Sequence, residues 1–177
     1  QTVYANTKNA PKNIFFPHTE KMMKYTRTEK GMEFSAAAEE AKEAVLFGAR
    51  PCDAMSFTLL DRLFDQEKYK DPFYIDKRSK TIIVAQACVH PPYSTCFCTS
   101  VDGSPTSEAG SDVMLTDVGD AYLVEFFTPK GEKLLKYFGD VKPDASADEK
   151  KKAIAEKAAG EIVSKIPAKE IKPILDV

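Results

Sequence analysis

Four cysteines are the residues of this chain whose type and spacing could do chemistry. Cys52 is separated from Cys88 by 35 residues, and Cys96 and Cys98 follow Cys88 in a C-x7-C-x-C pattern. Thiolate sulfur is a preferred ligand of zinc and of iron–sulfur clusters, and a [4Fe-4S] cube takes one cysteine for each iron. The pattern therefore predicts that all four cysteines bind one metal centre.

The spacing favours a [4Fe-4S] cluster over zinc, because structural zinc sites usually carry two C-x2-4-C pairs, which this chain lacks. A structural four-cysteine zinc module that docks subunits is the alternative. His90 lies two residues after Cys88 and could add a ligand, although a polar loop residue is the simpler interpretation. Thiol redox chemistry at Cys96 and Cys98 is a second alternative, and it requires a depressed thiolate pKa.

A strand–helix–strand unit is predicted to position these cysteines. Residues 44–47 and 81–87 are short apolar runs, typical of strands that are buried on both faces. Between them, apolar residues recur at three- and four-residue spacing up to about Gln66, which indicates an amphipathic helix whose N-cap is Asp53 or the residue before it. A crossover of this length joins parallel strands, whose carboxyl ends lie at the same edge of the sheet.

The cysteines are expected to converge at that edge. Cys52 follows the first strand, Cys88 follows the second, and Cys96 and Cys98 lie in the loop that comes next. The free N–H groups at the start of the helix are expected to lower the pKa of Cys52 and to donate to cluster sulfides. Three neighbours complete the predicted site: Arg50 adds positive charge, Asp53 caps the helix, and Phe97 shields the cluster from water.

The remaining pattern completes a predicted α/β fold. A turn-like sequence at residues 29–31 could join two short strands, and residues 113–116 and 122–127 predict an antiparallel hairpin. Residues 130–138 indicate a short helix. The predicted fold is thus a mixed sheet that contains a parallel strand–helix–strand unit and an antiparallel hairpin, with a carboxyl-terminal helix.

Two segments are predicted along the chain. Residues 1–139 form a cysteine-bearing α/β domain, and residues 140–177 comprise an acidic, proline-containing joint, a helix and a linker. The chain begins with Gln1 and ends without an obvious finishing element, so it is expected to be part of a longer protein.

Composition excludes several classes of protein. The 177 residues suffice for one domain with a hydrophobic core, and 25 basic residues nearly balance 27 acidic ones without forming a basic stripe. Nucleic acid is therefore not an expected partner. The longest strongly apolar run has about seven residues, so no membrane span is expected. Four cysteines are too few for a disulfide-stapled scaffold, which favours a reducing compartment and a cytoplasmic location.

Several motifs together resemble the amino-terminal region of a family of iron–sulfur electron-transfer subunits. This family includes the beta subunit of soluble nickel–iron hydrogenases (sulfhydrogenases) and the corresponding electron-transfer component of anaerobic sulfite reductase. The resemblance runs from about Pro11 to Phe138. It rests on residues 47–53 (FGARPCD), 71–74 (DPFY) with Arg78, 96–100 (CFCTS), 112–116 and 122–125.

The resemblance implies a cytoplasmic, oxygen-averse subunit that relays electrons between a flavin-bearing partner and a catalytic partner, and that does no bond chemistry itself. The family's ferredoxin-like half, with its C-x2-C-x2-C-x3-C-P runs for two [4Fe-4S] clusters, does not occur in these residues. It is expected downstream in the parent chain. The additional cluster at Cys52, Cys88, Cys96 and Cys98 is inferred from their predicted convergence, and the resemblance supports it.

Overall fold

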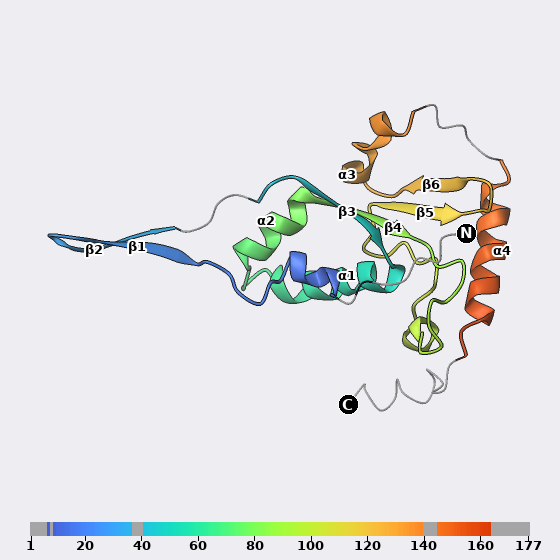
Figure 1. Ribbon diagram of the computed structural model, residues 1–177, viewed down its shortest axis with the longest axis horizontal. Coiled ribbons are helices and arrows are strands. Elements are labelled where there is room, and N and C mark those ends of the chain that lie inside the picture. The colour runs from blue at the N-terminus through green and yellow to red at the C-terminus, as the bar shows by residue number, and fades with distance from the viewer. Residues whose placement is uncertain (1–6, 8, 37–40, 140–144, 164–177) are drawn as a thin grey trace.

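The computed structural model describes residues 7, 9–36, 41–139 and 145–163, and in these it shows a mixed α/β fold (Figure 1). A four-stranded sheet has the order β3-β4-β5-β6, and a separate two-stranded sheet is formed by β1 and β2. The strands are β1 (Met23–Thr28), β2 (Gly31–Ala36), β3 (Ala44–Ala49), β4 (Thr81–Gln86), β5 (Val113–Asp117) and β6 (Tyr122–Phe126). The α-helices are α1 (Pro51–Phe64), α2 (Pro72–Lys80), α3 (Pro129–Glu132) and α4 (Ala147–Gly160).

The predicted strand–helix–strand unit is confirmed. β3 and β4 are parallel neighbours, and the chain between them forms α1 and α2. β5 pairs in parallel with the other side of β4, and the predicted antiparallel hairpin is β5 with β6. β3 and β4 therefore both end at the edge of the sheet from which the cysteine-bearing segments leave.

Two local expectations were wrong. The first helix begins at Pro51 with Arg50 as its N-cap, because proline suits the first helical position, where no N–H partner is needed. β3 is an edge strand rather than a strand buried on both faces, so Phe47 is 64% exposed. An apolar run does not reveal whether the strand has a partner on both sides. Among the described residues, β3 pairs only with β4.

Alternate residues of β4 build two apolar layers. On one face, Ile83 and Ala85 pack with Phe57 of α1, Tyr74 of α2 and Phe15. On the other face, Val84 packs with residues of β5, β6 and the segment after α3. The central strand is thus covered on both sides, which is the reason for its continuous apolar sequence.

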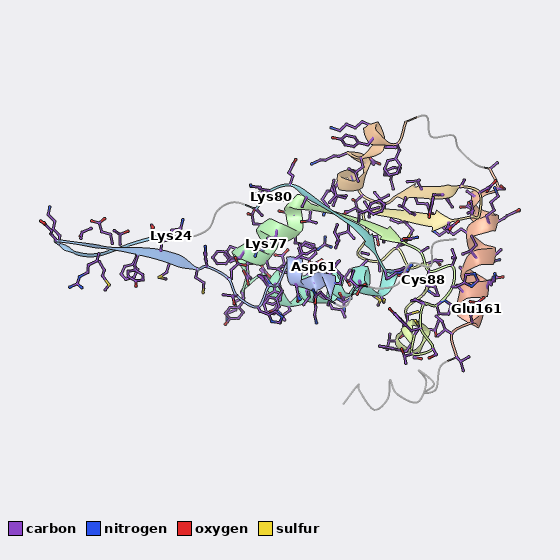
Figure 2. All side chains as sticks on the ribbon, in the orientation of Figure 1. Lys24, Asp61, Lys77, Lys80, Cys88 and Glu161 are labelled. Atoms are coloured by element: carbon purple, nitrogen blue, oxygen red, sulfur yellow. The ribbon has the colours of Figure 1, made fainter. Side chains whose placement is uncertain are left out.

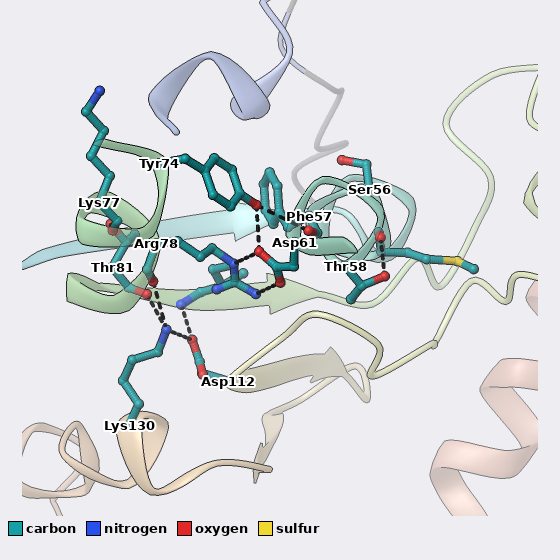
Figure 3. Close-up of polar contacts among 12 residues, drawn as sticks. Ser56, Phe57, Thr58, Asp61, Tyr74, Lys77, Arg78, Thr81, Asp112 and Lys130 are labelled. Carbon is teal, nitrogen blue, oxygen red and sulfur yellow. Dashed lines mark hydrogen bonds and ion pairs between the residues drawn. The ribbon is translucent and has the colours of Figure 1, made fainter. Parts of the chain in front are cut away.

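Two carboxylates join neighbouring elements of the fold (Figure 3). Arg78 of α2 donates two hydrogen bonds to the carboxylate of Asp61 on α1, at 3.1 and 3.2 Å, and the hydroxyl of Tyr74 donates to the same carboxylate at 2.6 Å. Asp112, which is 5% exposed, accepts from the N–H of Ile83 and from the hydroxyl of Thr128. The Asp61 contacts thus hold α2 against α1, and the contact of Asp112 with Ile83 holds the start of β5 against β4.

The carboxyl-terminal part differs in detail from the prediction. Residues 130–138 are divided between α3 and a 3-10 turn (Leu135–Tyr137) instead of one helix. The predicted carboxyl-terminal helix is present as α4 and ends at Gly160. Residues 140–144 of the predicted joint, and the predicted linker after 163, lie outside the described residues.

We expect Gly110→Ala to destabilise the fold by about 2 kcal/mol more than Gly119→Ala. Both glycines have positive φ, but an added Cβ at Gly110 would lie 2.0 Å from the carbonyl oxygen of Ala54 in α1, whereas at Gly119 it would meet nothing within 4 Å. Urea unfolding of the two variants measures the difference. Equal losses of stability would contradict the close packing of this loop on α1.

Candidate functional site

All four cysteines line one cavity of about 520 Å³ at the carboxyl edge of the sheet. Its volume falls within the range of about 300–1,000 Å³ that is typical of sites for small molecules and cofactors. Figure 2 shows Cys88 at the end of the sheet that lies beside α4. The wall is otherwise mainly apolar and includes Met55, Leu59, Tyr93, Phe97, Val101 and Ile162.

The elements predicted to carry the cysteines also place them. Cys52 is the second residue of α1, directly after β3, and Cys88 lies two residues beyond the end of β4. The N–H of Cys88 donates to the carbonyl of Pro105 at 2.9 Å. Cys98 begins a 3-10 turn (Cys98–Val101), and its carbonyl accepts from the N–H of Gly103 at 2.9 Å. These backbone bonds fold the long loop back over the edge of the sheet.

The other three cysteines are near enough to Cys88 to influence its pKa. Burial raises the pKa of Cys88 to about 11, against an ordinary value of 9.0. The positive charge of Arg50 lowers this pKa, while negative charge on Cys52, Cys98 or Cys96 raises it further. Four thiolates in this cavity would repel one another, so a positive charge among them would favour their joint ionisation.

The expected lowering of the Cys52 pKa was wrong. Burial by the cavity walls raises the pKa of Cys52, and the adjacent Asp53 carboxylate raises it again. Hydrogen bonding from the N–H of Asp53 acts in the opposite direction but is the smaller effect. Burial likewise raises the pKa of Cys98, which argues against the thiol redox alternative because that chemistry needs a depressed pKa.

Of the three predicted neighbours, Arg50 and Phe97 line the cavity, whereas Asp53 does not. Arg50 is 6% exposed, and its Nη1 donates to Sγ of Cys88 at 3.8 Å. Asp53 is the third residue of α1 and accepts from the backbone N–H of Arg50, so it stabilises the helix start from inside the first turn rather than as the N-cap. Phe97 lines the cavity but is 63% exposed, so it covers the sulfurs only in part.

The arrangement of donors bears on which centre fits. Among the residues that the structure describes, no three Cys, His, Asp or Glu side chains are grouped closely enough to hold a single metal ion. Zinc needs its ligands about 2.3 Å from one point, whereas each cysteine of a [4Fe-4S] cube binds its own iron. The described residues thus show no preformed site for a single ion, and one cysteine for each iron of a cube lines the same cavity.

Sequence reasoning missed most of the cavity wall. Met55, Ser56 and Leu59 follow Cys52 at intervals of three, four and seven residues, so they share its face of α1, and this periodicity could have identified them. His90, considered above as an added ligand, instead has its Nδ1 2.8 Å from Oε2 of Glu161, just beyond α4. Nothing in the local sequence indicates that this end of α4 meets the cysteine loop.

Comparison with known proteins adds no assignment: no family model, no curated protein and no solved structure matches the chain. The resemblance to electron-transfer subunits therefore stays a prediction that rests on the motifs. None of the helices in the described part of the chain has the length and apolar character needed to cross a bilayer.

In the metal-free protein, we expect Cys88 to react with iodoacetamide about a hundredfold more slowly than an ordinary cysteine at neutral pH. Raising the pKa from 9.0 to about 11 lowers the reactive thiolate fraction by about that factor. Arg50→Gln should slow the reaction further, because it removes a charge that favours the thiolate. Timed anaerobic alkylation with peptide mapping measures both rates.

The matched control is Lys24→Gln, which removes a positive charge on β1, far from the cavity (Figure 2). It should leave the rate at Cys88 unchanged. Alkylation of Cys88 as fast as that of a free cysteine, or a faster reaction in Arg50→Gln, would contradict the burial and charge environment described above.

Proposed function

We propose that this chain is the iron–sulfur-binding domain of an electron-transfer subunit in an anaerobic oxidoreductase complex of the hydrogenase or sulfite reductase type. Cys52, Cys88, Cys96 and Cys98 would each bind one iron of a [4Fe-4S] cluster. The observation that carries the proposal is that four cysteines from separate parts of the chain line one cavity. The motif resemblance supports the same assignment.

When bound, such a cluster accepts and releases one electron at a time. The residues of this chain set the conditions for that exchange. Arg50 places a buried positive charge next to Cys88, which favours the more negative, reduced state and so raises the reduction potential. The apolar side chains of Met55 and Leu59 line the cavity beside the cysteines and act in the opposite direction, because a low dielectric disfavours added charge.

The cavity is also close enough to the surface for exchange with a partner. Leu59, Tyr93, Phe97 and Val101 line it and are each between 48% and 63% exposed. A flavin-bearing partner, a catalytic partner or the ferredoxin-like domain expected downstream could approach the cluster across this apolar rim. The role of the domain is then electron relay, with bond chemistry performed by the partner.

Anaerobic reconstitution with ferrous iron and sulfide tests the proposal. We expect about four iron and about four acid-labile sulfide per chain, a brown colour, and an electron paramagnetic resonance signal of a [4Fe-4S] cluster after reduction. Cys88→Ser should lower the bound iron severalfold and broaden or abolish the signal. The matched control, Ser56→Ala, changes a cavity residue that carries no sulfur and should retain the full cluster.

Other outcomes identify the alternatives. Colourless protein that binds about one zinc per chain, with loss of zinc in Cys88→Ser, would replace the cluster with the structural zinc site for subunit docking. Protein that binds neither metal under these conditions would overturn the proposal. Circular dichroism of each variant distinguishes loss of a ligand from loss of the fold.

A further inference from the structure

The hairpin of β1 and β2, here called the arm (residues 23–36), projects from the body of the protein (Figure 1). Every residue of its two strands is exposed except Thr28, which is half-buried. A two-stranded hairpin without further packing is at best marginally stable in water. The arm therefore needs a packing partner that the described part of this chain does not provide.

Strand register separates the arm into an apolar and a polar face. Because side chains alternate along each strand, cross-strand pairs at every second position share a face. The apolar face carries the pairs Met23–Ala36, Tyr25–Phe34 and Arg27–Met32. The polar face carries Lys24–Ser35, Thr26–Glu33 and Thr28–Gly31. This is the pattern of a sheet with one covered face, although both faces are exposed in the described part of this chain.

The apolar face is large enough to support a specific interface. Met23, Tyr25, Met32 and Phe34 are each 60–68% exposed, and Met22 beside them is 67% exposed. With side chains of roughly 200 Å² each, this patch offers on the order of 600 Å². Covering it with an equal patch would bury about 1,200 Å² in total, which is the lower limit for a stable protein–protein interface.

We propose that a second copy of this chain covers the arm, with the two apolar faces stacked about a two-fold axis and the two arms running in opposite directions. A shallow hollow at the base of the arm is lined by Met22, Met23 and Phe34, and Met32 projects near its tip. In the antiparallel stack, the tip of each arm lies over the hollow of its mate. The face is thus self-complementary, as a two-fold interface requires.

The position of the charged residue Arg27 also favours antiparallel stacking of the two arms. Arg27 is the one charged side chain among the three pairs of the apolar face, and it lies near the tip. Antiparallel stacking places the two Arg27 side chains at opposite ends of the interface, whereas parallel stacking would bring them together and cause repulsion. The remaining charges of the strands, Lys24 and Glu33, lie on the polar face and stay in water.

Analytical ultracentrifugation of the full chain over a range of concentrations tests this inference. We expect a dimer in reversible equilibrium. Phe34→Glu should weaken dimerisation by about thirtyfold or more, because it buries a charge at the centre of the interface. Ser35→Glu is the matched control: it adds the same charge on the same hairpin, but on the polar face opposite Lys24, and the dimer should persist.

A wild-type chain that stays monomeric at its highest soluble concentration would overturn the inference, including one that forms a complex only with a different protein. A dimer that Ser35→Glu weakens as much as Phe34→Glu would also overturn it. Circular dichroism confirms that each variant retains its folded body. The measurement needs no bound cluster, so its outcome is independent of the function proposed for the cysteines.

Discussion

The parallel pairing of β3 with β4 is the constraint on which the cysteine site depends. Parallel neighbours end at the same edge of a sheet, so Cys52 and Cys88 become close in space although 35 residues separate them along the chain. The carboxylate of Asp61 holds α2 against α1, and that of Asp112 holds the start of β5 against β4. Hydrogen bonds from Cys88 and to Cys98 then fold the loop over the same edge.

The fold could be predicted from the sequence wherever a pattern of apolar residues is compatible with only one kind of element and one degree of burial. The periodicity of α1 and the apolar run of β4 are such signals, because a helix face and a doubly covered strand each leave a distinct pattern. The run of β3 is equally apolar, yet this strand lies at the edge of the sheet. An apolar sequence indicates that a segment is at least partly buried. It does not indicate whether the strand pairs on one side or on both.

The site could be predicted only as far as topology determines it. Strand order was sufficient to predict that the cysteines converge, and helix periodicity could have added Met55 and Leu59. The meeting of His90 with Glu161 depends on how α4 packs, for which no local signal exists. The raised pKa of Cys52 could not be predicted for the same reason. The N–H groups at the helix start, which lower this pKa, are visible in the local sequence, whereas the burial that raises it depends on cavity walls contributed by distant segments.

The apolar face of the arm and the cysteine cavity lie at opposite ends of the described part of the protein. The arm projects on the side away from α4, whereas the cysteine cavity opens at the edge of the sheet beside α4 (Figures 1 and 2). Two copies joined through their arms would therefore leave both cavities uncovered. Each cavity rim could then meet a separate redox partner, so assembly through the arm and electron transfer at the cysteines do not compete for the same surface.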